Sequence, residues 1–377
     1  LRKFHGEEYS THRGSSYNAY LVKDQKTALI DTVWTPFAKE FVLNLAKEID
    51  LNQIDYVIAN HAEMDHSGAL PELMRHIPDK PVYCTANGVK SLKGHYHKDW
   101  NFQVVKTGDK LSLGKKDLIF VEAMMLHWPD SMMEYLTGDD ILFSNDAFGQ
   151  HYATEHMFND LVDQAELFEE ATKYYANILT PFSPLVTKKI NEVVALNLPV
   201  KFICPSHGVI WRDNPLQIAH KYLEWAADYS ENQISLIYDT MWDGTRMLAE
   251  HIAKGIKQAD DKVTVKLFNV SRRDINDVVT EVFRSKAILL GSPTINKGIL
   301  NAMTALIEMI AGLKFKKKKA AAFGCYGWSG ESVKILSEHL SRAGFEVQGD
   351  GFRTMWQPGD EALAEAVAFG KDFAGKV

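Results

Sequence analysis

The chain has 377 residues, with 46% hydrophobic and 24% charged residues, which favours two domains and is typical of a soluble globular enzyme. Its formal net charge of −7 at pH 7 argues against a nucleic-acid binder, because phosphate binding needs clustered positive charge. No apolar run reaches the roughly 20 residues that a membrane helix needs, and the N-terminus lacks the apolar stretch of a secretory signal.

The first half of the chain alternates short apolar runs with polar loops. Runs on either side of Asp24-Gln25-Lys26 predict a β-hairpin formed by residues 17–22 and 27–31. Thr35-Pro36 is typical of a helix start, with Thr35 as the capping residue, so we expect a helix that ends near Ile49. Further short strands, each followed by a loop rich in His or Asp, are predicted at residues 54–59, 118–122, 141–144 and 202–204.

The second half of the chain alternates strands and helices regularly. Strands are predicted at residues 234–238, 263–268, 287–290 and 320–323, and helices are predicted to begin near Thr245, Ile275, Ile299 and Ser329. Such alternation indicates βαβ units in a parallel, doubly wound sheet. The change of pattern near residues 228–232 predicts one domain at residues 1–230 and another at residues 231–377.

One basic run, Lys314-Phe315-Lys316-Lys317-Lys318-Lys319, precedes the last of these predicted strands. We interpret it as a solvated turn, which is the usual place of a charge run. A docking patch for an acidic partner protein is the alternative interpretation.

A dense group of potential metal ligands follows the strand predicted at residues 54–59. The segment His61-Ala62-Glu63-Met64-Asp65-His66 contains four such ligands in six residues. A loop at a strand end can turn several side chains toward one point while the strand holds its base rigid. A polar loop with chance histidines is the alternative, but this density of ligand types favours a metal site.

The cysteines limit the kind of metal site. Cys84, Cys204 and Cys325 are far apart, and there is no C-x-x-C pair. This usage fits a reduced, cytoplasmic protein and excludes an iron–sulfur or rubredoxin-type site made of cysteines within this chain. Any metal must therefore be held by histidines and carboxylates.

The H-x-E-x-D-H pattern resembles the metallo-β-lactamase superfamily, which implies an αββα sandwich with further ligands at the ends of later strands. Candidates appear in the expected order in Leu126-His127-Trp128-Pro129, Ser144-Asn145-Asp146 and Ser206-His207-Gly208. A lone histidine is more often structural than a ligand, so the evidence for a metal site is that these residues occur together in the expected order. The implied ligands are His61, Glu63 and His127 for one metal and Asp65 and His207 for the other, with Asp146 as a bridge.

Glu63 decides which metal we expect. Zinc hydrolases of this superfamily usually have histidine at that position, and a carboxylate makes the site harder, which favours iron. His66 matches a zinc ligand of the superfamily, but in its iron-binding branch that position is often not a ligand, so we expect it beside the ligand set. His5, His151 and Tyr174 are candidates to line the substrate pocket and donate a hydrogen bond or a proton. A purely structural role is the alternative for each.

Three loops of the second half are suited to a flavin. Tyr238-Asp239-Thr240-Met241-Trp242-Asp243-Gly244-Thr245 opens a helix, where hydroxyls and backbone N–H groups can bind phosphate. It resembles the phosphate loop of flavodoxins, and no G-x-G-x-x-G or Walker pattern points to NAD or ATP. Flavodoxin-like folds bind FMN at the carboxyl ends of the strands, where two later loops should also lie. The predicted FMN-binding residues are Thr240, Met241, Trp242, Asp243, Gly244, Thr245, Ser292, Pro293, Thr294, Ile295, Asn296, Gly324, Cys325, Tyr326, Gly327, Trp328, Ser329 and Gly330. Thr240 and Thr245 would bind the phosphate and Trp328 could cover the ring, although each tryptophan alone could equally belong to the core.

A lactamase-like di-iron half followed by a flavodoxin half resembles the flavodiiron proteins over essentially the whole chain. Matching stretches are Phe4-His5-Gly6, Arg13-Gly14-Ser15-Ser16-Tyr17-Asn18, Leu126-His127-Trp128-Pro129-Asp130-Ser131-Met132, Tyr174-Tyr175-Ala176-Asn177 and Gly327-Trp328-Ser329-Gly330-Glu331. Residues 83–87, 144–152 and 211–215 resemble the branch of that family that reduces nitric oxide.

This resemblance implies reduction of nitric oxide to nitrous oxide, or of dioxygen to water, at a bridged non-haem di-iron site fed by FMN. It also implies a rubredoxin or rubredoxin-like electron donor with its reductase. The expected assembly is a head-to-tail homodimer or homotetramer, in which FMN of one subunit faces the iron of another. The nitric oxide reductase branch carries a C-terminal rubredoxin domain, and this sequence stops at Val377 without one. Either the sequence is the core of a longer protein or a separate protein delivers the electrons, so the immediate donor stays open.

Three other functions remain at this point. An oxygen reductase of the same family shares the iron ligands, so the ligand set cannot separate it from a nitric oxide reductase. A zinc hydrolase fused to a flavodoxin would keep the fold, but Glu63 argues against it. A pure electron carrier would use FMN alone and leave the metal site structural.

Overall fold

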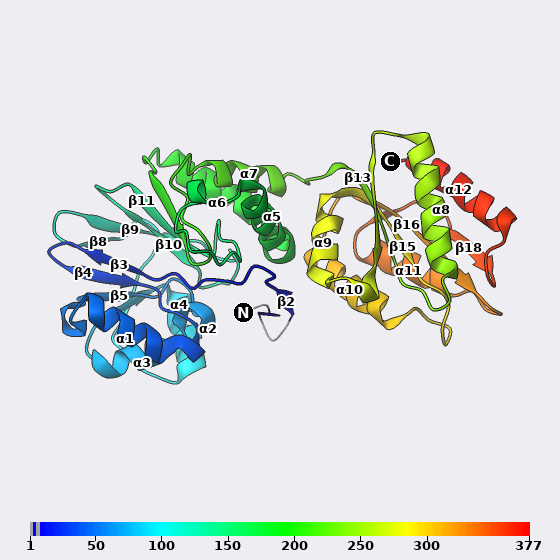
Figure 1. Ribbon diagram of the computed structural model, residues 1–377. Coiled ribbons are helices and arrows are strands. Elements are labelled where there is room, and N and C mark those ends of the chain that lie inside the picture. Colours follow the sequence, from blue (N-terminus) through cyan, green and yellow to red (C-terminus); the bar gives the residue numbers. More distant parts are fainter. Residues whose placement is uncertain (1–2, 5–7) are drawn as a thin grey trace. The chain divides into compact units, whose positions relative to one another are not determined.

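The computed structural model describes residues 3–4 and 8–377, which form two compact units. The first unit contains the described residues up to Tyr174 together with Phe182–Ala226. The second unit contains Tyr175–Pro181 and Ala227–Val377. Each unit has its own sheets and core (Figure 1).

Two five-stranded sheets form the centre of the first unit. One sheet has the order β3 (Tyr20–Lys23), β4 (Thr27–Ile30), β5 (Tyr56–Ile58), β6 (Val82–Cys84) and β7 (Phe102–Val104). The other has the order β12 (Phe202–Pro205), β11 (Ile141–Asn145), β10 (Met132–Leu136), β9 (Asp117–Glu122) and β8 (Lys110–Ser112). Buried side chains of both sheets, among them Ile30, Ile58, Phe120 and Phe143, pack into one core between them. The predicted hairpin of β3 and β4 is confirmed as an antiparallel pair.

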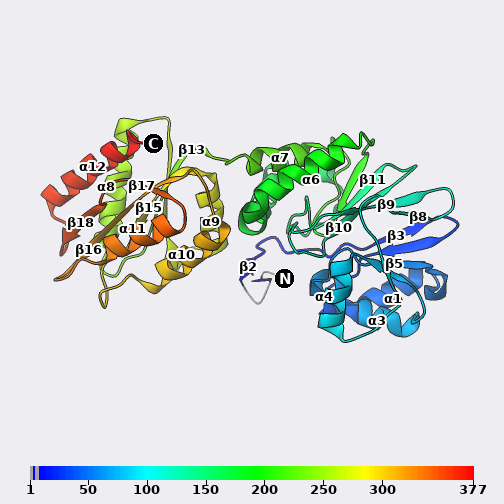
Figure 2. The ribbon, with the colours of Figure 1, turned by 180° about the vertical axis from the view of Figure 1, so that it is seen from behind.

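Helices cover the outer faces of this sandwich. One group comprises α1 (Ala38–Glu48), the short α2 (Met64–Ser67), α3 (Leu70–His76) and α4 (Ala86–Tyr96). The other comprises α5 (Gln164–Tyr174), α6 (Ser183–Ala195) and α7 (Gln217–Ala226), which both views place on the opposite side of the sheets from α1 and α3 (Figure 2). The αββα sandwich is therefore confirmed. The helix predicted from Thr35 begins instead with a 3₁₀ turn, Thr35–Phe37, which follows Trp34 without a side-chain cap.

Short segments complete the first unit. Lys3–Phe4 (β1) and Tyr9–Ser10 (β2) form a small antiparallel pair. Single 3₁₀ turns lie at Leu51–Gln53 and Asn159–Leu161. After α5 the chain passes through a π-helical turn, Tyr175–Leu179, and a 3₁₀ turn, Thr180–Phe182, most of which belong to the second unit.

The second unit is a parallel sheet with helices on both faces. Its strand order is β14 (Thr264–Asn269), β13 (Glu231–Tyr238), β15 (Ser285–Gly291), β16 (Lys319–Tyr326) and β17 (Glu346–Val347), and β18 (Phe352–Met355) also pairs with β16. All these pairs are parallel. The order is that of a flavodoxin-like sheet, as predicted.

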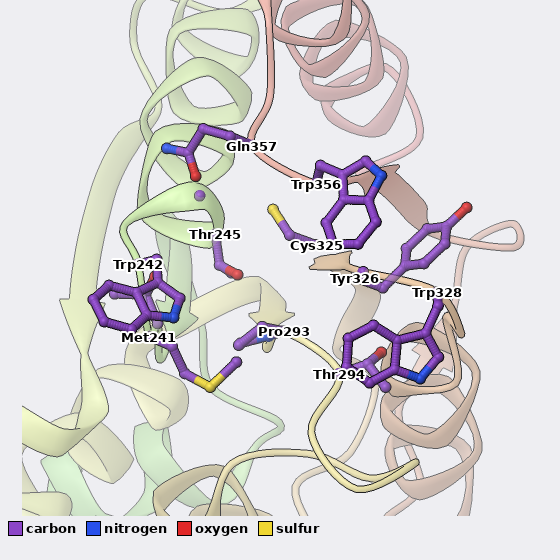
Figure 3. Close-up of a pocket in the computed structure, with 13 residues that line it drawn as sticks. Met241, Trp242, Thr245, Pro293, Thr294, Cys325, Tyr326, Trp328, Trp356 and Gln357 are labelled. Carbon is purple, nitrogen blue, oxygen red and sulfur yellow. The ribbon is translucent and has the colours of Figure 1, made fainter.

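The crossovers divide the helices of the second unit between the two faces of its sheet. Helices α8 (Gly244–Ala259) and α12 (Asp360–Ala374) pack against one face around Leu236, Leu289 and Phe323. Helices α9 (Ile275–Arg284), α10 (Asn301–Leu313) and α11 (Ser332–Arg342) lie on the other face in both views. A 3₁₀ turn, Val270–Arg272, precedes α9. Loops at the carboxyl ends of β13, β15 and β16 surround a cavity (Figure 3).

The basic run before β16 is not a uniformly solvated turn. Phe315 and Lys318 are 2% and 3% exposed, whereas the side chain of Lys317 is 75% exposed. The Lys318 ammonium donates to the carbonyl oxygens of Tyr229, Phe283 and Ser285 at 3.0, 2.7 and 2.6 Å. The prediction was therefore wrong for Lys318, because three backbone acceptors converge on its side chain inside the unit.

The structure also bears on the cysteines and on membrane-spanning helices. Cys84, Cys204 and Cys325 are buried free thiols. Across residues 3–4 and 8–377, we find no helix with the length and apolarity that crossing a bilayer requires.

Candidate metal centre and flavin pocket

The candidate metal ligands of the first unit come from four separate strand ends or loops. His61, Glu63, Asp65 and His66 follow β5, the last two inside the short helix α2. His127 lies in the loop between β9 and β10, Asp146 directly follows β11, and His207 follows β12. The N–H of Met132 at the start of β10 donates to the carbonyl of Asn60, which joins the two sheets beside this loop cluster.

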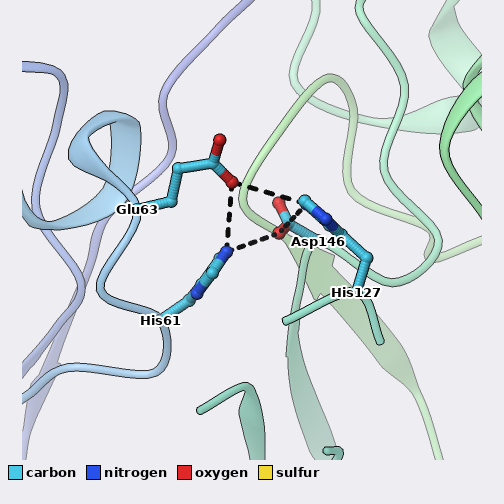
Figure 4. A group of neighbouring side chains, drawn as sticks. All are labelled: His61, Glu63, His127 and Asp146. Carbon is cyan, nitrogen blue, oxygen red and sulfur yellow. Dashed lines mark hydrogen bonds and ion pairs between the residues drawn. The ribbon is translucent and has the colours of Figure 1, made fainter. Parts of the chain in front are cut away.

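The first donor group contains His61, Glu63, His127 and Asp146, whose ligand atoms all lie within 4.8 Å of one another (Figure 4). Glu63 Oε2 lies 3.1 Å from His61 Nε2 and 3.4 Å from His127 Nε2. Asp146 Oδ2 lies 3.7 and 3.4 Å from the same two nitrogens. Four donors thus face one small volume.

The second donor group contains Asp65, His66 and His207. Asp65 Oδ2 lies 3.2 Å from His66 Nε2 and 3.0 Å from His207 Nε2. The other oxygen of Asp146, Oδ1, lies 2.9 and 3.5 Å from these nitrogens. Asp146 therefore directs one carboxylate oxygen at each donor group, which is the arrangement of a bridging ligand.

The spacing of the donors fits metal ions. Metal bonds of roughly 2.0–2.2 Å to nitrogen and oxygen put neighbouring ligand atoms about 3 Å apart or slightly more. Asp65 Oδ1 is buried and makes no hydrogen bond within the described part of the chain. Such orphaned groups are costly unless a partner completes them, so the donor set fits two cations.

The electrostatics of the cluster follow from three carboxylates among buried imidazoles. Burial acts to lower the pKa of His127, but Asp146 and Glu63 raise it to about 9. Burial opposes the same effect at His207, where Asp146 and Asp65 raise the pKa to about 10. Burial acts to raise the pKa of Asp146, yet the surrounding histidines hold it well below its usual range. Protons and metal ions compete for these nitrogens, so metal binding must displace protons.

His66 differs from expectation in its position. The sequence prediction set it beside the ligands, whereas its Nε2 contacts the same two carboxylates as His207 Nε2. His66 directly follows Asp65 in α2, and both side chains are buried in the cluster. The geometry therefore offers His66 as a seventh donor.

The proposed pocket residues lie beside the second donor group. The ring of His151 is 5.0 Å from that of His207 and 5.1 Å from that of Tyr174, and His151 Nδ1 lies 2.8 Å from Ser15 Oγ. Burial and, to a lesser extent, Asp146 raise the pKa of Tyr174, so the phenol stays protonated at neutral pH. His5 lies outside the described residues.

Outer contacts hold the ligands in place, and sequence reasoning missed them. His207 Nδ1 donates to the carbonyl of Ser16 at 2.8 Å, and Ser16 Oγ accepts the N–H of Gly208. Gly208 has a φ of +77°, and a Cβ there would lie 1.7 Å from an oxygen of Gln150. His61 Nδ1 lies 3.2 Å from Asp130 Oδ2. Asp130 stands in the stretch that carries His127, so its place in the sequence was the available signal.

The flavin pocket is a cavity of about 360 Å³ in the second unit. Predicted residues that line it are Thr240, Met241, Trp242, Gly244, Thr245, Pro293, Thr294, Cys325, Tyr326, Gly327 and Trp328. Predicted residues outside this lining are Asp243, Ser292, Ile295, Asn296, Gly324, Ser329 and Gly330. Ser292, for example, is fully buried and accepts the N–H of Leu300. Trp356 and Gln357 also line the cavity and were missed, because the sequence analysis predicted no strand corresponding to β18.

The pocket fits a phosphate joined to a flat ring. Thr245 Oγ1 in the first turn of α8 and Thr240 Oγ1 in the loop before it are buried and have no hydrogen-bond partner among the described residues. Figure 3 shows Trp242 on one side of the cavity and Tyr326, Trp328 and Trp356 on the other. The three tryptophans are 85%, 88% and 62% exposed, in the order 242, 328 and 356. Hydroxyls at a helix N-terminus bind phosphate, and exposed aromatic faces can stack on a flavin ring.

Comparisons with known proteins agree with both domains. A family model described as ODP family beta lactamase matches residues 16–208, and a flavodoxin model matches residues 236–370. The anaerobic nitric oxide reductase flavorubredoxins of Klebsiella pneumoniae and Escherichia coli K12 are each 57% identical over 99% of this chain and 78% of their own length.

Solved structures give the same result. Rubredoxin oxygen:oxidoreductase from Desulfovibrio gigas matches with a TM-score of 0.96 and 36% identity, over 100% of this chain and 94% of that one. The flavodiiron protein from Giardia intestinalis matches with a TM-score of 0.94 and 32% identity, over 100% and 92%. With both domains matched and the relatives this similar, the chain belongs to the flavodiiron protein family.

Proposed function

We propose that this chain reduces nitric oxide to nitrous oxide at a di-iron centre, with electrons delivered through FMN. The observation that carries the proposal is a pair of donor groups joined by Asp146 in a chain that also has a flavin pocket. The 57% identity to proteins named nitric oxide reductases favours this gas. The reaction balances as two nitric oxide molecules, two electrons and two protons giving nitrous oxide and water.

The proposed metal assignment takes five of the seven donors as ligands of one iron each and Asp146 as the bridge, and leaves His66 beside the second group. His61, Glu63 and His127 hold one iron, Asp65 and His207 hold the other, and Asp146 gives one oxygen to each. When bound, the irons supply electrons and open positions for the gas. Three carboxylates among the donors support iron rather than the zinc of a hydrolase, because carboxylate ligands make the site harder.

The protein itself supplies a closed, proton-donating environment. We assign His151 and Tyr174 to the wall of the gas pocket, because both are buried against His207. The Tyr174 phenol keeps its proton at neutral pH and can donate a hydrogen bond. Ser15 orients His151 through the 2.8 Å contact to Nδ1.

The flavin assignment places the phosphate on Thr240 and Thr245 and the ring between Trp242 and Trp328. Trp356 and Gln357 complete the wall of the pocket. We assign the iron centre to a domain of residues 1–230 and FMN to a domain of residues 231–377.

A rubredoxin-type protein with its reductase is the proposed electron donor, because the Desulfovibrio gigas relative is named for rubredoxin. A head-to-tail homodimer or homotetramer in the cytoplasm is the proposed assembly. A flavin-loaded monomer that turns over at the full rate would contradict it.

Anaerobic turnover with nitric oxide, compared with turnover of dioxygen, tests the proposed function. The purified protein, with iron and FMN quantified, is reduced and mixed with each gas separately. We expect a larger rate with nitric oxide and nitrous oxide as its product. A much larger rate with dioxygen would support the second candidate, an oxygen reductase, which the name of the Desulfovibrio gigas relative favours. Stoichiometric zinc without iron would support a hydrolase instead.

Replacing Thr245 with valine should weaken FMN binding by about 10- to 100-fold. The substitution keeps the side-chain volume but removes a buried hydroxyl, and a hydrogen bond to a charged group contributes about 1.5–3 kcal/mol. Titration of the flavin-free protein with FMN measures the Kd. Thr245→Ser should bind FMN nearly as tightly as the original chain. Thr264→Val, at an exposed position of β14, is the matched control. An unchanged Kd in Thr245→Val would contradict the phosphate assignment.

A further inference from the structure

Asp130 is a buried carboxylate that touches a proposed metal ligand without belonging to either donor group. It is 1% exposed and follows His127 by three residues. One oxygen, Oδ2, accepts the N–H of Ala62 at 2.7 Å and lies 3.2 Å from His61 Nδ1. The other oxygen, Oδ1, is buried and makes no hydrogen bond within the described residues. Asp130 thus contacts the His61 loop from behind the metal centre.

The loop that carries Asp130 is fixed from several sides. Thr85, which caps α4 by accepting the N–H of Gly88, also donates its hydroxyl to the carbonyl of Asp130 at 3.0 Å. Asn87 donates to the carbonyl of Pro129 at 3.1 Å. The ring of Trp128 meets that of His61 edge to face at 5.0 Å. These contacts define where the carboxylate stands.

The two proposed metal positions differ in the hydrogen-bond partner of a histidine Nδ1 atom. His61 Nδ1 has a carboxylate partner, whereas His207 Nδ1 donates to the neutral carbonyl of Ser16 at 2.8 Å. A histidine whose Nδ1–H is bound has only Nε2 free for a metal, so its partner fixes the tautomer. A charged partner also makes the imidazole a stronger donor than a neutral partner does.

We propose that Asp130 is a positioning residue that fixes the tautomer of His61 and adds to the electronic difference between the two iron positions. The iron held by His61, Glu63 and His127 receives more electron density and is therefore harder to reduce than it would be without Asp130. This inference rests on the proposed metal assignment.

Two substitutions of Asp130 separate its effect on the position of His61 from the effect of its negative charge. In Asp130→Asn the amide oxygen can replace Oδ2 and keep both hydrogen bonds, while the NH₂ group takes the place of the oxygen that has no described partner. In Asp130→Ala both hydrogen bonds are lost. Asp99→Asn removes the same unit of charge from a side chain that is 86% exposed and serves as the control.

The test measures iron binding and iron spectra in the full FMN-loaded chain. Asp130→Ala should bind one of its two irons about 10- to 100-fold more weakly, the cost usual for losing an outer partner of a metal-bound histidine. Asp130→Asn should keep two irons per chain, shift the Mössbauer signal of one iron only, and raise the reduction potential of that iron. Asp99→Asn should change none of these quantities.

Three outcomes would overturn the proposal. Original iron affinity in Asp130→Ala would show that Asp130 does not position His61. An unchanged spectrum in Asp130→Asn, or equal shifts of both irons, would show that the charge does not distinguish the two positions. Because none of these readings needs turnover, a chain that binds two irons but fails to reduce nitric oxide would sink the proposed function and leave this test intact.

Discussion

Replacing Asp146 with alanine should remove the iron centre and reduce nitric oxide turnover by more than about 100-fold. That factor is the upper end of what loss of an outer partner of a metal ligand costs, and Asp146 is proposed to bind the metals directly. FMN content should not change, because the flavin pocket belongs to the other unit.

The physical reason is that the two carboxylate oxygens of Asp146 face different donor groups. Oδ2 is 3.4 Å from His127 Nε2 in the first donor group, and Oδ1 is 2.9 Å from His66 Nε2 in the second. Alanine therefore removes a donor and negative charge from both groups at once. The buried histidines would then face two cations with two carboxylates, Glu63 and Asp65, in place of three.

The measurement is iron per chain by metal analysis, together with anaerobic nitric oxide consumption. Asp146→Asn keeps one carbonyl oxygen and should retain about one iron, so it distinguishes a bridging ligand from a ligand of one metal. Asp99→Asn should retain both irons and full turnover. Two tightly bound irons in Asp146→Ala would contradict the bridge.

The donor set could be predicted from the sequence because its members either lie close together in the chain or follow successive predicted strands. Four potential ligands in residues 61–66 mark the first loop, and His127, Asp146 and His207 each follow a predicted strand. Strand ends meet at one edge of a sandwich, so order along the chain becomes proximity in space. The three dispersed ligands needed the superfamily resemblance as well, since a single histidine carries little information.

Contacts that depend on the direction of a side chain could not be predicted. His66 and Asp65 are adjacent, and only the turn of α2 shows that His66 reaches Asp146 while Asp65 reaches His207. Asp130 stands in the stretch that carries His127, but it lies 69 residues from His61, and no pattern of residue types indicates that these two side chains are in contact. Trp356 reaches the flavin pocket through β18, a four-residue strand too short to give a clear periodic signal.

The basic run shows the same limit in another form. Lys317 and Lys318 are neighbours with the same side chain, yet the first is solvated and the second is enclosed. Both residues precede β16, and Lys317 lies in a bend with a φ of +54° that turns the chain before Lys318. Which of the two lysines is enclosed depends on that bend and on packing, and the composition of the run reveals neither.

Lys318→Met should lower the stability of the second unit by about 3 kcal/mol, since each buried polar group left unpaired costs about 1–3 kcal/mol. Three carbonyls lose their donor, and that of Phe283 lies in the last turn of α9, where the helix supplies no partner. Removing a buried charge offsets part of this loss. Burial lowers the pKa of Lys318 to about 7, but three carbonyl acceptors match the three N–H groups of an ammonium, so we expect the charged form near neutral pH.

Thermal unfolding followed by flavin release gives the measurement, and the neighbouring residue gives the control. At 2–4 °C per kcal/mol for a domain of this size, Lys318→Met should lower the Tm by about 6–12 °C. Lys317→Met removes the same charge and an exposed ion pair with Asp228, which contributes about 0–1 kcal/mol, so its Tm should hardly move. Equal shifts in the two variants would mean that net charge, rather than the three carbonyl contacts, accounts for the effect of Lys318.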